Sequence, residues 1–539
     1  MEVPVIDLFA GPGGLGEGFS AFVSSFEKRI NFKIVLSIEK DLHAHSTLTL
    51  RSFFRQFPRG EVPGDYYDFI KGKINLIELY KRWPDQAQKA MNEAWLAELG
   101  EGPGAVPFEI VDKRIKEALG GREDWLLVGG PPCQAYSIAG RSRRKEKFLD
   151  EKKDERVGLY KQYLRILAVH NPVVFVMENV KGLLSARTKR NSVFAKMLAD
   201  LRDPVGAVLS EQFVDGADLK CPGYRVYSLV APPAGFDTEG NPVFKHEDFI
   251  IKSEKYGIPQ ARHRVILLGI RKDIDFNPRI LEMRDEVPIS HVLNGLPKIR
   301  SIVSRSQDSD KDWRAAIEKI NCTNIFSKIE KDVAEEIIKQ LKKIDSVQYP
   351  VGGDYFKYDK VTSRYRPDWF VDPNIKGGCN HSSRGHMESD LVRYFFAACF
   401  AKVKNRSPKL EDFPNSILPA HKNVKDGVEG KKFSDRFRVQ LWNKPCKTIT
   451  SHISKDGHYY IHPDPTQCRS FTVREAARIQ TFPDNYYFCG PRTAQFVQVG
   501  NAVPPLLANQ IAEIVSDIFE SIRMGRIWEK ERDCQKCYK

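Results

Sequence analysis

The chain has 539 residues, too many for one compact core, so two or more domains are expected. A formal net charge of +14 and a sequence pI of about 9.1, spread through a globular composition, favour an acidic partner, nucleic acid before a membrane surface. The absence of a long apolar run and of a signal-peptide pattern, together with only ten cysteines, argues against a membrane-spanning or disulfide-rich secreted protein and predicts a soluble intracellular one.

The first element predicted is a buried strand over Val3–Phe9, followed by the glycine-rich turn of residues 10–16. A strand, such a turn and a helix are how Rossmann-like folds bring backbone N–H groups to a nucleotide-like ligand. A second strand over Phe32–Ile38 ends at Glu39, roughly where an acidic side chain binds ribose hydroxyls in such folds. A solvated strand-end acid is the alternative interpretation of Glu39.

The next stretch has a mostly helical pattern and is interpreted as a helix followed by an inserted helical hairpin, at about residues 58–105, on the flank of the sheet. The three expected helices cover Ser46–Phe57, Tyr66–Tyr80 and Asp85–Leu99. A short strand over Glu109–Val111 is expected to end at Asp112.

Residues 129–137 read Gly-Gly-Pro-Pro-Cys-Gln-Ala-Tyr-Ser and follow a predicted buried strand over Asp124–Val128. The glycines and prolines end that strand and present Cys133 at its carboxyl end, where open α/β sheets bind ligands. Cys133 is therefore a candidate nucleophile, with a small buried cysteine in an ordinary loop as the alternative. The basic run at residues 141–147 is either a solvated loop or a clamp for phosphates.

An amphipathic helix and three further strands follow. They are expected over Leu159–His170, Val173–Met177, Tyr224–Val230 and Arg264–Ile270. The first of these strands delivers Glu178 at its carboxyl end. Arg262 and Arg264 stand at alternate positions at the entrance of the last strand, which predicts that they share one face.

The alternation of strands and helices ends at about residue 272. Residues 272–444 contain mixed short elements and are treated as a separate domain, and residues 526–539 form a tail. The tail has one Cys-x-x-Cys spacing without a second pair or a nearby histidine, which is interpreted as incidental rather than as a metal site.

The C-terminal part is predicted to contain two helices joined by a loop. The first covers Ser470–Phe482, with Thr472 and Glu475 at the spacing of a capping box. The loop at residues 498–505 then leads into a last amphipathic helix, at about Leu506–Arg523.

Three strand ends thus each deliver one reactive type: Cys133, Glu178 and the Arg262–Arg264 pair. A soft nucleophile, a carboxylic acid and a guanidinium suit a planar, poorly reactive heterocycle such as cytosine. Addition of a thiolate at C6 makes C5 nucleophilic, an acid at N3 assists the addition, and a cation can hold O2. A base within a duplex must be flipped out to be reached.

The sequence resembles the DNA (cytosine-5) methyltransferases over nearly all of the chain except the middle domain. Six motifs carry the resemblance in the family's order: Asp-Leu-Phe-Ala-Gly-Pro-Gly-Gly at 7–14, Gly-Pro-Pro-Cys-Gln-Ala-Tyr-Ser at 130–137, Glu-Asn-Val at 178–180, Gln-Ala-Arg-His-Arg at 260–264, Arg-Glu-Ala-Ala-Arg-Ile-Gln at 474–480 and Gly-Asn-Ala-Val-Pro at 500–504.

The resemblance implies an α/β fold: a Rossmann-like S-adenosylmethionine-dependent methyltransferase sheet with helices on both faces, plus a smaller mixed target-recognition domain. Residues 1–271 would be the catalytic, cofactor-binding domain, residues 272–444 the recognition domain, and residues 445–525 the return to the catalytic domain. The implied catalytic residues are Cys133 as nucleophile, Glu178 at cytosine N3, Arg264 at cytosine O2, and Arg262.

The implied cofactor is S-adenosyl-L-methionine, with S-adenosyl-L-homocysteine as product and no metal. Its expected contacts are Asp7, Phe9, Gly11, Gly14, Glu39, Asp112, Pro131, Leu159 and Asn501. Asp112 is preferred to its rival Asp65 for the adenine, although the family's Gly-Asp-Ile is here Val-Asp-Lys.

Double-stranded DNA is the implied substrate, bound in the cleft between the two domains. Gln134, Ser137, Arg141 and Arg143 are expected to contact it near the catalytic loop. Candidates in the middle domain are His381, Arg384, His386, Arg393 and Arg436, each with ordinary surface charge as the alternative.

The leading hypothesis is therefore a DNA (cytosine-5-)-methyltransferase that modifies a short duplex site in a restriction–modification system. It would act as a monomer in the prokaryotic cytoplasm, beside a separate restriction endonuclease and without a membrane partner. The alternatives are a tRNA cytosine-5 methyltransferase, whose Cys-Phe-Thr signature this chain lacks, and a catalytically silent DNA-binding module.

Overall fold

The computed structural model describes residues 1–24, 30–100, 102–131, 155–187, 192–210, 219–358, 363–420, 424 and 434–537, with backbone alone for 155–158 and 527–537. None of the helices in these ranges has the length and apolar composition needed to cross a membrane.

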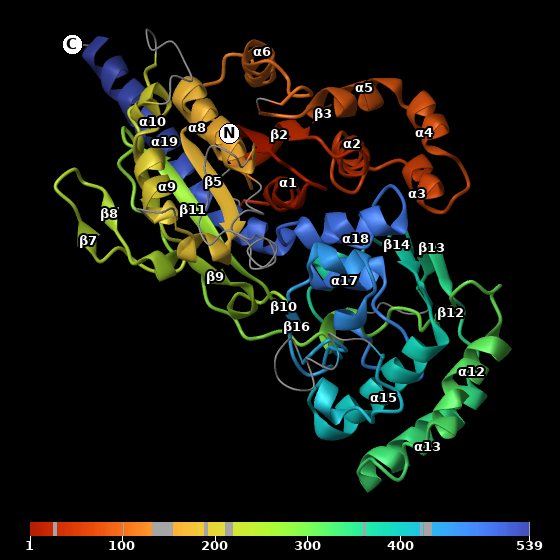
Figure 1. The fold of residues 1–539 in the computed structure, drawn as a ribbon. Coiled ribbons are helices and arrows are strands. Elements are labelled where there is room, and N and C mark those ends of the chain that lie inside the picture. Colours follow the sequence, from red (N-terminus) through yellow and green to blue (C-terminus); the bar gives the residue numbers. More distant parts are fainter. Residues whose placement is uncertain are drawn as a thin grey trace.

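A central mixed sheet organises the first half of the chain (Figure 1). Within the described residues it has eight strands, in the order β3-β2-β1-β4-β5-β11-β6, with β9 also paired to β11. The first five strands in this order run parallel, and β11 is antiparallel to its neighbours. The strands are β1 (Glu2–Leu8), β2 (Asn31–Glu39), β3 (Ala94–Leu96), β4 (Leu126–Gly129), β5 (Val174–Val180), β6 (Tyr224–Tyr227), β9 (Ile250–Lys252) and β11 (His263–Arg271).

Helices cover both faces of the sheet. On one face, Ile6 and Leu8 of β1 pack in a core with α6 (Phe108–Leu119), α8 (Glu155–His170) and α9 (Val193–Arg202), beside α10 (Pro204–Ser210). On the other, Val3 and Val5 pack with α1 (Gly14–Ser20) and α19 (Pro505–Cys537). Alternate residues of one strand therefore feed two cores, which confirms the predicted Rossmann-like architecture.

Several predicted elements differ in the structure. The expected helix over Asp85–Leu99 is α5 (Pro84–Glu93) followed by β3, because pairing with β2 takes residues 94–96 into the sheet. The helix expected over Tyr66–Tyr80 is two helices, α3 (Gly64–Ile70) and α4 (Leu76–Arg82), while α2 covers Leu42–Arg55.

The strand expected over Glu109–Val111 is also wrong, because these residues lie in α6. Val111, Ile115 and Leu119 recur every fourth residue and are all buried against the sheet. The three-residue window that suggested a strand is shorter than one helical turn and could not reveal this period.

The middle segment, residues 272–444, is built around the buried helix α15 (Glu388–Lys404), against which α12 (Asp310–Glu318) and α13 (Lys331–Ser346) pack. Its other elements are α11 (Ser290–Leu293), β12 (Ile302–Val303), β13 (Gly352–Lys357), α14 (Pro367–Phe370), β14 (Gly377–Ser382) and β15 (Gly385–His386). Small two-stranded sheets join β12 to β15, β13 to β14, β7 (Gly235–Phe236) to β8 (Pro242–Val243), and β10 (Gln260–Ala261) to β16 (Cys446–Lys447).

The predicted capping box at the start of α17 (Val473–Ile479) is confirmed. Thr472 Oγ1 accepts the Glu475 N–H at 3.1 Å, and Glu475 Oε2 accepts the Thr472 N–H at 2.8 Å. The loop expected at residues 498–505 is shorter than predicted, because α18 (Arg492–Asn501) continues to residue 501. Two prolines, Pro504 and Pro505, confine the turn to the residues just before α19.

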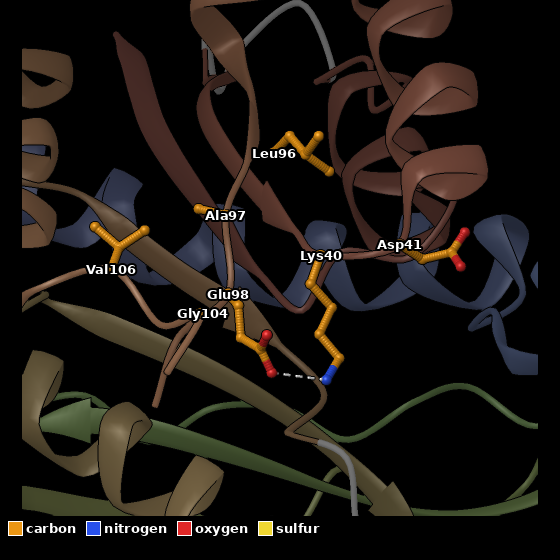
Figure 2. Close-up of a pocket in the computed structure, with 7 residues that line it drawn as sticks. All are labelled: Lys40, Asp41, Leu96, Ala97, Glu98, Gly104 and Val106. Carbon is orange, nitrogen blue, oxygen red and sulfur yellow. Dashed lines mark hydrogen bonds and ion pairs between the residues drawn. The ribbon is translucent and has the colours of Figure 1, made fainter. Parts of the chain in front are cut away.

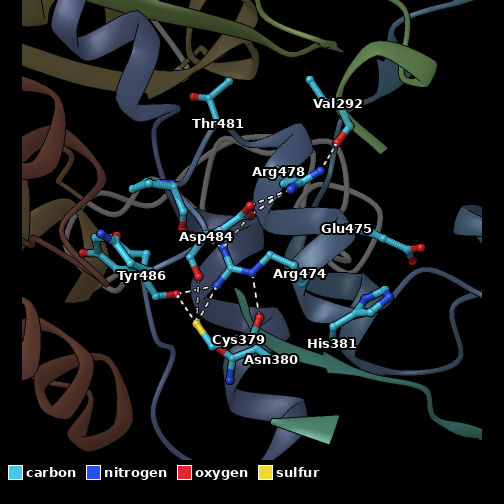
Figure 3. A network of polar contacts seen from close by, with 12 residues as sticks. Val292, Cys379, Asn380, His381, Arg474, Glu475, Arg478, Thr481, Asp484 and Tyr486 are labelled. Atoms are coloured by element: carbon cyan, nitrogen blue, oxygen red, sulfur yellow. Dashed lines mark hydrogen bonds and ion pairs between the residues drawn. The ribbon is translucent and has the colours of Figure 1, made fainter. Parts of the chain in front are cut away.

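Buried arginines join α17 to the middle segment (Figure 3). Arg478 forms a buried ion pair with Asp484, its Nε lying 2.9 Å from Oδ1, and its Nη1 donates to the Val292 carbonyl at 2.7 Å. Arg474 donates to the Cys379 carbonyl on β14 at 2.7 Å. Removing one partner of such a pair leaves an uncompensated buried charge, so this network fixes the middle segment against the C-terminal segment.

A second contact joins the middle segment to α2–α5. Tyr66, Tyr67 and Leu79 share a buried apolar cluster with Ile375 and Cys379. The Tyr67 hydroxyl also donates to Asp372 at 2.7 Å. The helices that precede β3 therefore help to hold the middle segment in place beside the sheet.

His381 was a candidate for facing DNA, but its side chain is fully buried. Its Nδ1 lies 2.9 Å from the Thr472 hydroxyl and its Nε2 lies 2.9 Å from the Pro297 carbonyl. Burial, opposed by the charge of Glu475, lowers the pKa of His381 to about 4. The neutral ring is thus part of the core, and the expectation of DNA contact for this residue is wrong.

This burial predicts a loss of stability in mild acid. The unfolded chain protonates His381 near pH 6.5 but the folded protein only near pH 4, so stability falls as the pH falls between these values. His381→Gln should remove up to about 1.4 kcal/mol per pH unit of that slope. Urea unfolding across this pH range measures it. The exposed His291→Gln is the control, and equal slopes in all three proteins would contradict the assignment.

Candidate active site

The glycine-rich turn after β1 needs glycine at some positions for its backbone conformation and at others for lack of space. Gly11 and Gly13 have φ of +57° and +90°, and Phe9 has φ of +55°, an uncommon value for a residue with a side chain. A Cβ on Gly14 would lie 2.3 Å from the Val503 carbonyl oxygen, whereas one on Gly11 would meet no atom within 4 Å. The turn is therefore packed on the Val503 side and open on the Gly11 side.

Glu39, at the end of β2, holds this turn. Its Oε2 accepts the Gly11 N–H at 2.7 Å, and its Oε1 accepts the N–H groups of Lys40 and Asp41 at 2.9 and 2.8 Å. Asp7 lies beneath the turn with 1% of its surface exposed, and burial raises its pKa to about 7. The two acids thus differ: Glu39 stands at the rim and Asp7 in the interior.

A pocket of about 460 Å³ opens where β2 and β3 end (Figure 2). Its lining residues are Lys40, Asp41, Leu96, Ala97, Glu98, Gly104 and Val106. Lys40 Nζ lies 3.0 Å from Glu98 Oε1, and both side chains are partly exposed. Leu159 lies close by, since a Cβ on Gly100 would be 3.4 Å from its Cδ2. This is the strand edge at which Rossmann-like folds bind nucleotides.

Asp112 does not lie at the end of a strand, contrary to expectation. It is on α6, where its carboxylate accepts hydrogen bonds from Arg165 Nη1 at 2.8 Å and pairs with His170 Nε2 at 2.7 Å. Burial acts in the opposite direction, but these two partners lower the pKa of Asp112 below its usual range. Its rival Asp65 is on α3, where it pairs with Arg82 and accepts the indole N–H of Trp83.

Glu98 is an acid that does stand near a strand end. It lies two residues after β3, and its side chain lines the pocket. The available signal was an acid followed by the glycine cluster of residues 100–104. Because a single helix is expected from the sequence over residues 85–99, Glu98 is not expected at a strand end.

Glu178 and Arg264 meet on the neighbouring strands β5 and β11. Arg264 Nε lies 2.9 Å from Glu178 Oε1, with 17% and 14% of the two side chains exposed. A Cβ on Gly130 would lie 3.1 Å from Glu178 Oε2, so the chain that leaves β4 passes over this carboxylate. Pro131 follows and is buried. Cys133, Gln134, Ser137, Arg141 and Arg143 lie outside the described residues.

Arg262 lies just before the strand that carries Arg264, and burial together with the nearby Arg264 charge lowers the pKa of its guanidinium. β11 begins at His263, which leaves Arg262 in the turn after β10, with 2% of its surface exposed. Its Nη1 donates to the carbonyls of Ile449 and Gly500 at 2.8 and 3.2 Å. Arg262 therefore ties the strand that carries Arg264 to the end of α18, one residue from the exposed Asn501.

Two other candidates for DNA contact are occupied within the protein. His386 is buried and its Nε2 accepts the Ser470 N–H at 3.2 Å. Arg393 pairs with Asp390 at 2.7 Å and donates to the Ile417 carbonyl. Their side chains stabilise the middle segment and do not face solvent freely.

Comparison with known proteins gives a consistent result. The family model for C-5 cytosine-specific DNA methylases matches residues 105–204 and 244–517. The type II methyltransferase M.Bpa9945I of Bacillus paralicheniformis is 32% identical over 533 residues, covering 95% of this chain and 98% of that protein. The type II methyltransferase M.DdeI of Desulfomicrobium norvegicum is 27% identical, covering 96% and 90%. The DNA (cytosine-5-)-methyltransferase M.ApeKI of Aeropyrum pernix is 26% identical, covering 78% and 87%.

The family match extends over more than half of the chain, and the relative from Bacillus aligns almost from end to end. Together with the motifs and the sheet that carries them, these matches show that the chain belongs to the C-5 cytosine-specific DNA methylases and hence to the enzyme class DNA (cytosine-5-)-methyltransferase.

Proposed function

We propose that this protein is the modification methyltransferase of a type II restriction–modification system and methylates C5 of a flipped-out cytosine in a short duplex site. The observation that carries the proposal is the Glu178–Arg264 pair, which lies where the chain leading to Cys133 leaves the sheet. The names of the relatives in Bacillus and Desulfomicrobium support the type II assignment.

In the proposed reaction the Cys133 thiolate forms a bond to C6 of cytosine, which makes C5 nucleophilic. Glu178 binds the ring at N3, and the Arg264 guanidinium holds O2 as negative charge develops there. After methyl transfer, the C5 proton passes to water, the electrons of the C5–H bond re-form the C5–C6 double bond, and Cys133 leaves as thiolate, which restores the aromatic ring. Arg262 acts in this scheme by positioning Arg264 and the end of α18.

S-adenosyl-L-methionine is the proposed methyl donor, and the site fits it. The open side of the turn at Gly11 suits close approach of a ligand to backbone, and Glu39 stands at the rim where a ribose would lie. Phe9 and Gly14 are proposed contacts in the same turn. Asp7, Pro131, Leu159 and Asn501 remain proposed contacts. When bound, the cofactor supplies an electrophilic methyl group, and the demethylated product is S-adenosyl-L-homocysteine.

The adenine contact is proposed for Glu98 in place of Asp112, because Glu98 lines the pocket whereas the carboxylate of Asp112 is bound by Arg165 and His170. Glu98→Gln should weaken S-adenosylmethionine binding about tenfold, the usual value of one hydrogen bond to a charged acceptor. Asp112→Asn should leave binding within about twofold and lower thermal stability. Calorimetric titration separates the two, and the reverse order of effects would reject Glu98.

The substrate, oligomeric state and cellular location of the enzyme are also proposed. The enzyme is proposed to act on double-stranded DNA as a monomer in the prokaryotic cytoplasm, without a metal, with the cognate restriction endonuclease as a separate protein. Family membership supports the DNA substrate, and the presence in one chain of both the catalytic motifs and the segment expected to recognise DNA supports a monomer.

Bisulfite sequencing of a plasmid from cells that express this chain tests the function. Protected cytosines confined to one short motif would establish C5 methylation and reveal the recognition sequence. If a folded, expressed protein protects none, an RNA substrate or a silent DNA-binding module becomes the better explanation.

A further inference from the structure

Two arginines near the start of α18 have no carboxylate partner. Arg384 follows β14 and Arg492 is the first residue of α18, and no described carboxylate lies within 4 Å of either guanidinium. Neighbouring arginines behave differently: Arg393, Arg469 and Arg478 each pair with an acid. A guanidinium with a buried, unpartnered Nε, as in Arg384, is costly for a protein to retain without an anionic partner, and the exposed Arg492 places a second unpaired cation near it.

Arg384 is held rigidly in place. Its Cζ lies 4.4 Å from the ring centroid of Phe496 on α18, and its Nη2 donates to the Ile453 carbonyl at 2.7 Å. Its Nε is buried without a hydrogen-bond partner. Stacking and one hydrogen bond therefore orient the guanidinium but leave part of its donor capacity unused.

Arg492 lies on the same side of α18 as Phe496, since the two are four residues apart. It is exposed and makes no hydrogen bond or ion pair with the described residues. Burial, opposed by Tyr394 and reinforced by the charge of Arg492, lowers the pKa of Arg384 to about 10, so the two cations repel each other. The charge of Asp456 acts on Arg384 and that of Asp354 on Arg492, but neither acid forms an ion pair within 4 Å with these arginines.

The position of the pair relates it to the active site. Figure 1 shows α18 between the central sheet and the middle segment. The exposed residues Thr493, Val497 and Asn501 form one stripe along this helix, from Arg492 to the end that Arg262 holds. Nine residues of helix span about 13 Å, the length of about four base pairs.

We propose that Arg384 and Arg492 form a binding site for a backbone phosphate of the DNA substrate, a few nucleotides from the flipped cytosine. A phosphate can accept hydrogen bonds from both guanidiniums and would relieve their repulsion. The site carries no base recognition, so it fixes the position of the duplex along α18 and not the sequence that is read. This inference rests on the proposed function, because it takes duplex DNA as the substrate.

The test is the salt dependence of DNA binding by the full-length protein, measured by fluorescence anisotropy with a labelled duplex of about 30 base pairs. Arg492→Gln should weaken binding about threefold to tenfold and reduce the slope of log Kd against log salt by about one. Arg492→Lys should keep most of the slope. Lys116→Gln, an equal charge change on the exposed side of α6, should leave it unchanged.

An unchanged slope in Arg492→Gln, or an equal reduction in Lys116→Gln, would overturn the site. Thermal unfolding of Arg492→Gln checks that the fold is kept, which is expected because Arg492 is exposed and bonds to none of the residues that the structure describes. If the wild-type protein binds duplex DNA with the predicted slope change but methylates no plasmid, the proposed function fails and the phosphate site stands. If it binds no duplex at all, the site is rejected.

Discussion

Cys133→Ser is expected to lower the rate of methyl transfer by roughly 10⁴-fold while duplex DNA binding persists. A serine hydroxyl ionises far less readily than a thiol, so addition at C6 of cytosine becomes very slow. The fold should tolerate the change, because the two side chains are close in size. Single-turnover transfer of a labelled methyl group to plasmid DNA measures the rate, and a gel-shift assay measures binding.

The matched control is Cys322→Ser, the same atomic change at an exposed cysteine in the middle segment. It should methylate at the wild-type rate. If Cys133→Ser also methylates normally, the nucleophile is another residue and the proposed mechanism is wrong. If instead binding and methylation are lost together, Cys133 acts mainly in binding or folding.

The sheet could be predicted well from sequence because its strands are short buried runs bounded by glycine, proline or an acid. Val3–Phe9 and Asp124–Val128 are apolar except for Asp7 and Asp124, and their carboxyl ends carry the glycine-rich turn and the loop with Cys133. Glu178 was expected just past a strand ending at Met177, but β5 continues to Val180, so Glu178 lies within the strand near its carboxyl end. Its meeting with Arg264 follows from the pairing of β5 with β11.

Features that depend on distant partners could not be predicted in this way. β3 has three residues and exists because β2 offers a free edge, so Glu98 was hidden inside an expected helix. Arg262 was expected at the entrance of a strand, facing the site. Its Nη1 instead donates to carbonyls about 190 and 240 positions away in the sequence, which no local pattern could indicate. His381 is a polar residue of a type that is common on protein surfaces. Only the tertiary fold shows that its ring is buried against the Thr472 hydroxyl and the Pro297 carbonyl.

Glu178→Gln is expected to reduce kcat by about 10²- to 10⁴-fold, the usual contribution of a positioned acid. The amide keeps the size of the side chain but loses its negative charge and its capacity to share a proton with N3. It also weakens the ion pair with Arg264, whose Nε lies 2.9 Å from Oε1, so the guanidinium at O2 is less well oriented. Both effects act on the developing charge in cytosine rather than on cofactor binding.

Glu254→Gln provides the matched control, because Glu254 is a second partly buried glutamate whose partner also lies on β11. Glu254 Oε1 lies 2.8 Å from His263 Nε2, and His263 is adjacent to Arg264. Its substitution disturbs the strand locally without touching Glu178 and should change kcat by less than about threefold. Equal losses in the two variants would mean that the Glu178 effect is structural. A large loss confined to Glu178→Gln, with the affinity for S-adenosylmethionine unchanged, would place this carboxylate at the reacting base.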